Sequence, residues 1–267
     1  MLEIKNAVLG YRGKQKNKIV LDGLSFSLAP GELLCILGAN GVGKTTMYRT
    51  VLGFLPLLGG SILIDGEDIS GLTRERLAKR IAYVPQVHSP PFPYTVFDVV
   101  LMGRSAHLQQ FATPGKADEE ITCEMLERMG ILSLKDEIYT EISGGERQLV
   151  LIARALAQQS AYILMDEPAS NLDYGNQMRM LQTIRELAGQ GIGVCFTSHY
   201  PTHAFLTEAS VLAIERRDRA RKGSAREIIT EPLLREMYGL DAEIRPVADR
   251  DGREHTSILI HMETSHM

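Results

Sequence analysis

The stretch from Gly38 to Thr46 reads Gly-Ala-Asn-Gly-Val-Gly-Lys-Thr-Thr and matches the pattern GxxxxGK[ST]. A short apolar run over residues 32–37 precedes it, and residues 45–52 have helical character. Strand, glycine-rich loop and helix form the context in which backbone N–H groups and the positive end of a helix surround a phosphate group. The stretch therefore predicts a phosphate-binding loop (P-loop).

The P-loop pattern also assigns roles to single side chains. Lys44 is placed to reach the β- and γ-phosphates of a nucleotide, and the Thr45 hydroxyl is placed to bind Mg²⁺. A chance match to the pattern is expected in about one chain of this length in a hundred. The residues expected to bind the nucleotide phosphates are Gly38, Asn40, Gly41, Gly43, Lys44, Thr45 and Thr46.

Two carboxylates follow a second apolar run. Residues 161–165 (Ala-Tyr-Ile-Leu-Met) read as a strand that is buried on both faces of a parallel sheet, and Asp166 and Glu167 come directly after it. Beside a P-loop, Asp166 suits the coordination shell of Mg²⁺, usually through a water molecule. Glu167 suits a general base that polarises the attacking water. The pair extends the prediction from a phosphate site to an ATP hydrolase.

A second candidate anion site lies far from the P-loop in the sequence. Residues 142–146 read Ile-Ser-Gly-Gly-Glu and open an expected helix. Ser143, Gly144 and Gly145 would present a hydroxyl group, open backbone N–H groups and the helix dipole. A single nucleotide has no evident need of two such sites from one chain.

Taken in order, these motifs resemble those of the ATP-binding-cassette (ABC) family, whose signature motif reads LSGGQ. The chain has Ile142 and Glu146 where that motif has Leu and Gln. The first change keeps an aliphatic side chain, and the second keeps the reach of the side chain but adds a charge. The resemblance extends over about residues 2–240.

The resemblance implies roles for four more residues. Tyr11 is similar to the aromatic residue that stacks on adenine, and Gln86 is similar to the Q-loop glutamine near the metal and the attacking water. Asp173 ends a segment that is similar to the D-loop, and His199 resembles the switch histidine that contacts the γ-phosphate. The implied catalytic residues are Glu167, His199 and Gln86, and the implied Mg²⁺ ligands are Thr45, Gln86 and Asp166.

Members of this family pair head to tail, so that the P-loop of one cassette faces the signature motif of the other. The resemblance therefore implies a homodimer that holds two ATP molecules, with Mg²⁺, between its subunits. This arrangement accounts for two anion sites in one chain.

The expected elements alternate between strands and helices, which is typical of an α/β protein. The resemblance implies a P-loop NTPase fold with a mixed, partly parallel sheet, a small antiparallel β subdomain and a helical subdomain at about 87–160. Residues 1–241 are expected to form a single ABC ATPase domain. Residues 242–267 are expected to form a C-terminal extension with one further strand at 257–262.

Composition narrows the class of protein. With 29 basic and 33 acidic residues the formal charge is −4, which argues against a nucleic-acid binder. The three cysteines share no close spacing, which favours reduced thiols in the cytosol. The N-terminus does not read as a signal peptide, and no apolar run approaches the roughly 20 residues that span a bilayer. We therefore expect a partner to hold the chain at the cytoplasmic face of a membrane.

Residues 94–107 and 223–241 resemble the cassette subunits of type II importers. The resemblance implies polytopic permease partners, an indirect link to a substrate-binding protein, and a metal chelate of the iron–siderophore, haem or cobalamin type as cargo. A related branch imports molybdate or tungstate. Residues 87–107, with Phe97 and Met102, would line a groove for the permease. The motifs are also compatible with an exporter cassette or with a soluble cassette ATPase that acts on nucleic acid.

Two further features invite a functional interpretation. The basic run 216–222 is expected to form a solvated hairpin turn, although it could also bind anionic lipid head groups. His255, His261 and His266 suggest a metal site, but their spacing and their place near the terminus argue against one.

Overall fold

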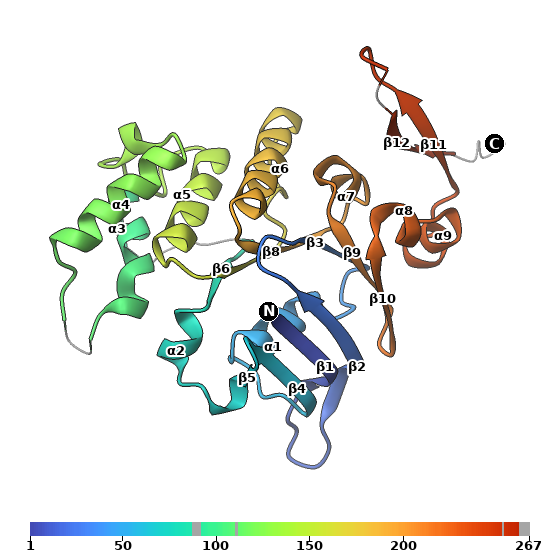
Figure 1. The fold of residues 1–267 in the computed structure, drawn as a ribbon, viewed down its shortest axis with the longest axis horizontal. Helices are drawn as coiled ribbons and strands as arrows, with labels where there is room; N and C mark the ends of the chain where they lie inside the picture. Colours follow the sequence, from blue (N-terminus) through green and yellow to red (C-terminus); the bar gives the residue numbers. More distant parts are fainter. Residues whose placement is uncertain (87–91, 110–111, 253, 262–267) are drawn as a thin grey trace.

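A six-stranded sheet forms the centre of the computed structural model, which describes residues 1–86, 92–109, 112–252 and 254–261 (Figure 1). Its strand order is β10-β9-β3-β8-β7-β6, and only the pairing of β10 with β9 is antiparallel. The strands are β3 (Leu33–Gly38), β6 (Ile81–Val84), β7 (Tyr162–Met165), β8 (Gly193–Ser198), β9 (Ser210–Arg216) and β10 (Arg219–Ser224). The expected mixed, partly parallel sheet is confirmed.

Alternation along β3 divides the interior into two cores. All six residues of β3 are buried. Leu34 and Ile36 face one core, whereas Leu33, Cys35 and Leu37 face the other. Because successive side chains of a strand point to opposite faces, a strand covered on both sides must be apolar throughout. This is why the run before the P-loop contains no polar residue after Glu32.

An antiparallel sheet of order β2-β1-β4-β5 covers one face of the central sheet, with α1 (Lys44–Val51) packed between the two sheets (Figure 1). Its strands are β1 (Leu2–Tyr11), β2 (Lys18–Leu28), β4 (Gly59–Ile64) and β5 (Glu67–Asp68). Met47 and Tyr48 of α1 belong to the core that both sheets share. The antiparallel β part that the family resemblance implied is therefore present.

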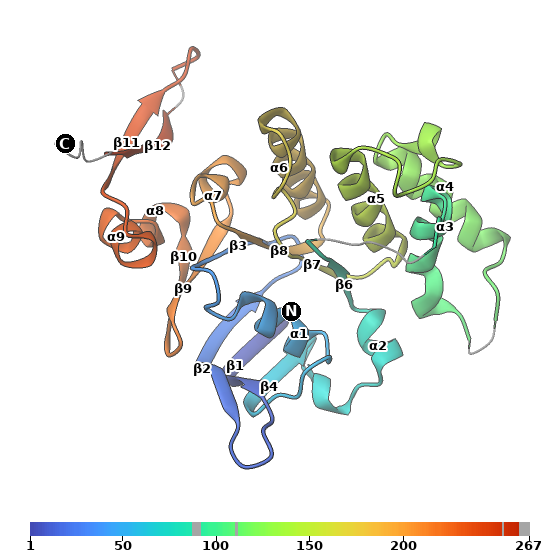
Figure 2. The ribbon, with the colours of Figure 1, turned by 180° about the vertical axis from the view of Figure 1, so that it is seen from behind.

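Helices cover the opposite face (Figure 2). α5 (Gly144–Ala157), α6 (Tyr174–Gly189) and α7 (Thr202–Thr207) lie over the sheet, while α3 (Val96–Leu101) and α4 (Lys116–Arg128) pack beside α5. The smaller helices are η1 (Ile69–Gly71), α2 (Arg74–Ala78), η2 (Met102–His107) and η3 (Leu132–Leu134). Residues 87–91, with which the expected helical subdomain begins, lie outside the described residues.

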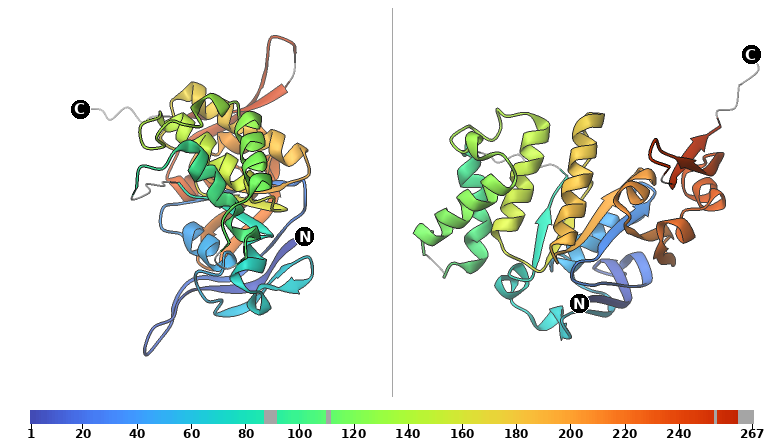
Figure 3. Two further views of the ribbon diagram at one scale, coloured as in Figure 1. Left: turned by 90° about the vertical axis from the view of Figure 1, so that its left-hand side faces the viewer. Right: turned by 45° about the horizontal axis from the view of Figure 1, so that its top comes forward.

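The C-terminal part ends in a β-hairpin that projects away from the sheets (Figure 3). α8 (Ala225–Ile228) and α9 (Glu231–Tyr238) lead to β11 (Ala242–Ala248), which pairs with β12 (Glu254–Ile260). The strand expected at 257–262 corresponds to β12, although Met262 lies outside the described residues. No strand was predicted at 242–248, where Pro246 interrupts the pattern. A two-stranded ribbon has only edge strands, and edge strands tolerate proline.

The basic run differs in extent from the prediction. Instead of a turn over 216–222, only residues 217 and 218 lie between β9 and β10, and the rest of the run pairs in the sheet. Its cations contact carboxylates. The pairs are Arg216–Asp218, Arg217–Asp22, Arg219–Glu215, Arg219–Glu236, Arg221–Glu215 and Lys222–Glu32. The contacts with Asp22, Glu236 and Glu32 join the hairpin to other parts of the protein, and the remaining pairs lie within the hairpin.

The two described histidines of the tail each lie beside a carboxylate. His255 Nε2 is 2.9 Å from Asp249 Oδ2, and His261 Nε2 is 3.8 Å from Glu243 Oε2. His266 lies outside the described residues. Among residues 1–86, 92–109, 112–252 and 254–261, no cluster of His, Cys, Asp and Glu suits a metal ion. Within those same ranges, no helix has the length and apolar character to cross a bilayer.

Candidate nucleotide site

The P-loop turns back on itself between β3 and α1. Gly43 has φ 123°, and a Cβ there would lie 2.8 Å from Val20 Cγ1, so both conformation and packing require glycine. Lys44 Nζ donates to the carbonyl oxygen of Gly38 at 2.6 Å, which folds the lysine over the loop. Burial lowers the pKa of Lys44, and the charges of Glu167 and Asp166 oppose that shift.

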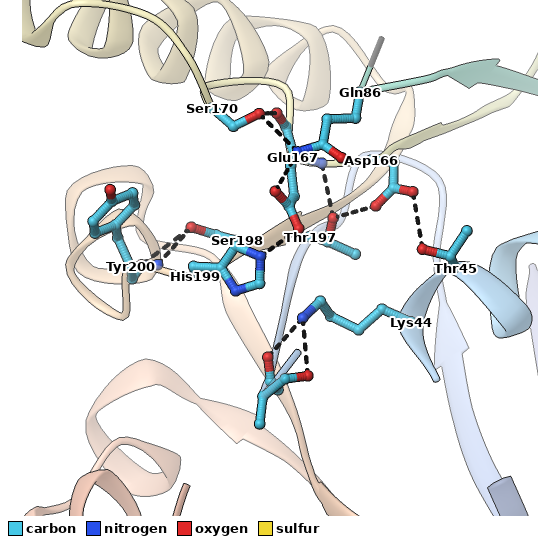
Figure 4. A network of polar contacts seen from close by, with 12 residues as sticks. Lys44, Thr45, Gln86, Asp166, Glu167, Ser170, Thr197, Ser198, His199 and Tyr200 are labelled. Carbon is cyan, nitrogen blue, oxygen red and sulfur yellow. Dashed lines mark hydrogen bonds and ion pairs between the residues drawn. The ribbon is translucent and has the colours of Figure 1, made fainter. Parts of the chain in front are cut away.

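Asp166 stands at the carboxyl end of β7 and receives hydrogen bonds from three elements, two of which, from Thr197 and Thr45, are drawn in Figure 4. Thr197 Oγ1 of β8 donates to Oδ1 at 2.9 Å, and Thr45 Oγ1 of α1 donates to Oδ2 at 3.3 Å. Tyr83 OH of β6 lies 3.4 Å from the same Oδ2. Burial and the negative charge of Asp166 raise the pKa of Tyr83 to about 12, so the phenol remains a donor. These contacts join the P-loop helix to the central strands.

Glu167 is held in an uncommon conformation next to Asp166. Its φ of 49° lies in the left-handed region, which costs a non-glycine residue on the order of 1 kcal/mol. The backbone N–H of Glu167 donates to Thr197 Oγ1 at 2.8 Å, and Gln86 Nε2 donates to Glu167 Oε2 at 2.8 Å. His199 Nε2 contacts the other carboxylate oxygen (Figure 4). Three residues predicted to be catalytic therefore lie in direct contact.

Tyr11 lies at the end of β1, beside the P-loop. Its side chain is exposed, and its hydroxyl oxygen is 3.3 Å from Thr46 Oγ1. An exposed aromatic ring next to a phosphate loop is suited to stack on a base. The structure thus brings this sequence-predicted residue to the nucleotide site.

The second anion site is built as a helix cap. Ser143 is the N-cap of α5, and its hydroxyl accepts from the backbone N–H of Glu146 at 3.3 Å. Glu146 Oε2 accepts in turn from the Ser143 N–H at 2.8 Å, and hydrogen bonds to its carboxylate from the side chain and then from the backbone of Ser143 lower the pKa of Glu146. A capping box can have either Glu or Gln at its third helical position. This explains why Glu146 can stand where the family motif has Gln. The described bonds of Ser143 stay within this cap and do not reach the P-loop.

Asp173 caps the next helix, α6. Its Oδ1 accepts from the backbone N–H of Asn176 at 3.0 Å, and its Oδ2 accepts from Asn176 Nδ2 at 2.6 Å. These bonds hold the pKa of the Asp173 carboxyl below its ordinary value. We call the network of side chains around Asp166 and Glu167 the P-loop cluster. Asp173, like Ser143, bonds within its own helix cap and not to this cluster.

Sequence reasoning missed two residues of the P-loop cluster, Thr197 and Tyr83, and identified a third, Ser170, only as the first residue of the D-loop-like segment that ends at Asp173. Ser170 Oγ donates to the Glu167 carbonyl oxygen at 2.8 Å. Thr197 was identifiable from strand register, because Met165 pairs with Phe196 in the parallel β7–β8 ladder and the following residues must then lie side by side. No comparable signal marked Tyr83.

The fold and the cluster together define a P-loop nucleotide-binding cassette. The sequence profile of the ABC transporter family matches residues 21–170. An uncharacterised ABC transporter ATP-binding protein of Haemophilus influenzae is 39% identical over 244 residues, which is 91% of each chain. The molybdate import ATP-binding protein MolC of the same organism is 33% identical over 261 residues, which cover 97% of this chain and 94% of MolC.

Solved structures support the same assignment. The structure of a metal-chelate type ABC transporter in an inward-facing conformation has a TM-score of 0.84 and 32% identity, with 98% of both chains covered. The chain belongs to the ABC transporter family of ATP-binding proteins. It is an ABC ATPase cassette that binds and hydrolyses ATP.

Proposed function

We propose that this chain is the ATP-hydrolysing subunit of a membrane importer whose cargo is a metal chelate. The observation that carries the hydrolytic part is the placement of Glu167. Its carboxylate contacts Gln86 and His199, and its neighbour Asp166 contacts Thr45 of the P-loop helix. A carboxylate beside a phosphate loop, with polar groups on both of its oxygens, can take a proton from water that attacks a phosphate.

The donor set beside the P-loop suits Mg²⁺. Thr45 and Asp166 offer hydroxyl and carboxylate oxygens 3.3 Å apart, and the amide of Gln86 lies nearby through its contact with Glu167. Hard cations of this size prefer oxygen ligands and are bound by few protein groups together with substrate phosphates. Mg²⁺ bound there would neutralise charge on the β- and γ-phosphates. Thr45, Asp166 and Gln86 are the residues that would hold it.

The remaining residues bind and orient the substrate. Lys44 and the backbone N–H groups of the loop hold the phosphates, and Tyr11 stacks on the adenine. Glu167 takes the proton of the attacking water, while His199 contacts the γ-phosphate and fixes the direction of attack. The γ-phosphorus–oxygen bond to ADP breaks as the bond to the water oxygen forms, which releases ADP and phosphate.

The second anion site leads us to propose a homodimer. Ser143, Gly144 and Gly145 open a helix of 14 residues whose N-terminus has no phosphate to bind within its own chain. A second copy placed head to tail would bring these groups to the P-loop of its partner, so that each ATP lies between two subunits. Release of phosphate would then let the subunits separate and transmit a movement.

Import requires permease subunits, which we place against the helical side of the cassette. Phe97 is partly buried against the core, and Met102 is more than a third exposed. Such partly covered apolar side chains suit a docking groove. In this proposal the chain works at the cytoplasmic face of the membrane, and a substrate-binding protein acts on it through the permease. We assign residues 1–241 to the cassette and 242–267 to an extension.

Molybdate or tungstate is the second candidate cargo. The match with MolC covers 97% of this chain. The match with the metal-chelate type transporter covers 98%, so the two are about equally complete. Both cargoes are recognised by other subunits in this architecture. The cassette residues therefore do not distinguish them.

The hydrolytic assignment is tested by Glu167→Gln. The variant keeps the contacts to Gln86 and His199 but lacks the basic carboxylate, so we expect ATP to bind normally and turnover to fall about 100-fold or more. The cargo is tested with a complex reconstituted with its permease, in which binding proteins loaded with ferric chelate, haem, cobalamin or molybdate are compared for stimulation of ATPase activity. Wild-type turnover by Glu167→Gln would contradict the general-base assignment.

A further inference from the structure

A buried histidine lies four residues after His199 and has no part in the scheme above. His203 of α7 is 4% exposed, and its Nδ1 is 2.9 Å from Ser198 Oγ. Burial lowers the pKa of His203 to about 4, so its ring is neutral at neutral pH. A neutral imidazole carries one donor and one acceptor, and a hydroxyl group can act as either, so this bond forms with either tautomer.

The Ser198 hydroxyl is also bound to the turn that carries His199. The backbone N–H of Tyr200 donates to Ser198 Oγ at 3.0 Å, and the backbone N–H of His203 donates to the Tyr200 carbonyl oxygen at 3.0 Å. The rings of Tyr200 and His203 lie 5.1 Å apart between centroids. The two residues that flank His199 in the chain are thereby both attached to His203.

Because both neighbours of His199 are attached, its own side chain has a restricted direction. Figure 4 shows Ser198 and Tyr200 on one side of the turn and the imidazole of His199 directed to Glu167 on the other. Glu167, Ser198, His199 and His203 also line one small cavity behind the carboxylate. A change at His203 can therefore alter the contact between Glu167 and His199 through Ser198 and Tyr200.

We propose that His203 is a positioning residue that, through the Ser198 hydroxyl, fixes the turn at 198–200 so that His199 meets Glu167 and the γ-phosphate. This inference rests on the role proposed for His199. His203 itself touches neither ATP nor the attacking water. Positioning of this kind acts on turnover rather than on nucleotide affinity, since the loop that binds the phosphates belongs to other elements.

The test compares two replacements of the ring. In His203→Asn the side-chain amide stands near the position of Nδ1 and can still bond to Ser198, whereas His203→Leu fills the space without a polar group. We expect His203→Leu, and Ser198→Ala with it, to lower kcat about ten- to hundredfold with the Kd for ATP unchanged. His203→Asn should retain most of the wild-type kcat.

Thr207→Val is the matched control. Thr207 is also buried on α7, but its hydroxyl bonds to the His203 carbonyl oxygen within the helix and not to the turn. We expect this variant to keep the wild-type kcat. Thermal unfolding of each variant identifies any loss of fold, and Ser198→Ala, a smaller change, tests the same link independently of His203.

A double-mutant cycle separates this inference from the proposed function. If His203 acts through His199, His203→Leu has no further effect on kcat in a His199→Ala background. An equal effect in both backgrounds, wild-type turnover by His203→Leu, or equal impairment of the Asn and Leu variants would overturn the positioning role. Wild-type turnover by His199→Ala alone would instead contradict the role of His199 itself.

Discussion

The P-loop cluster and the Ser143 cap, which we propose as the two parts of one nucleotide site, are organised differently. Asp166 and Glu167 are bound by side chains from β6, β8, α1 and the segment after β6, so four parts of the chain meet in one network. The side chains of Ser143 and Glu146 instead bond to each other's backbone N–H groups, within one turn of α5. The first site is a convergence of distant segments, and the second is complete within a single helix turn.

The difference indicates what each site requires. A hydrolytic centre must fix several groups relative to one another, and only tertiary structure does that. A helix cap can be made by four consecutive residues and presented to whatever approaches it. In the shared site proposed above, the P-loop cluster supplies groups that are fixed relative to one another within one chain, and the cap supplies groups presented to the other copy.

Removing the lysine of the P-loop should have a larger effect than any other change considered below, and it should act on the affinity for ATP. Lys44→Ala deletes the charge that would contact the phosphates, and we expect the Kd for ATP to rise about ten- to hundredfold, as for a lost hydrogen bond to a charged group. Titration calorimetry with ATP measures the change. Lys116→Ala, at an exposed position on α4, is the control and should bind ATP as the wild type does. Unchanged affinity in Lys44→Ala would show that the lysine does not bind the nucleotide.

Thr197→Val tests the network around the two carboxylates. The change keeps the shape of the side chain but leaves Asp166 Oδ1 and the Glu167 N–H without this partner. We expect the free energy of unfolding to fall by about 1–3 kcal/mol, with a drop in kcat. Urea unfolding and steady-state hydrolysis measure the two effects. Thr197→Ser retains the hydroxyl and should stay close to the wild type, and equal loss in both variants would argue against the hydrogen bonds as the cause.

Acid should destabilise the turn beside Glu167 through His203. The pKa of this histidine is about 4 in the folded protein and about 6.5 when unfolded, so the unfolded chain binds the proton first. Its stabilising contribution is full above pH 6.5 and is lost as the pH falls towards 4. Between pH 7 and 5 the wild type should lose about 1–2 kcal/mol more unfolding free energy than His203→Asn. Parallel pH profiles for the two proteins would contradict the buried, neutral ring.

Ser143→Ala should have the smallest effect on the isolated chain. Loss of the N-cap hydroxyl is expected to cost about 1 kcal/mol of stability, and the affinity of the monomer for ATP should not change. Glu146→Gln, which keeps a capping box, is the control and should cost less. A weaker affinity of monomeric Ser143→Ala for ATP would mean that the cap and the P-loop communicate within one chain.

The two sites also differ in how far the sequence predicts them. Lys44, Glu167 and Ser143 each belong to a motif of consecutive residues and could be identified directly. Thr197 required the register of β7 against β8, and His203 required the packing of α7, neither of which is a local property. β11 was missed for a similar reason, because its pairing with β12 outweighs the unfavourable Pro246.

Mixing two defective variants tests the shared site most directly. Lys44→Ala damages the P-loop and Ser143→Arg blocks the cap, and in a Glu167→Gln background ATP that binds should stay bound. In a head-to-tail dimer of the two variants, one site combines both defects and the other is intact. We therefore predict that neither variant alone forms an ATP-containing dimer in sedimentation, whereas their mixture does. A mixture that stays monomeric, or ATP-dependent dimers of either variant alone, would contradict a site completed by a second copy of the chain.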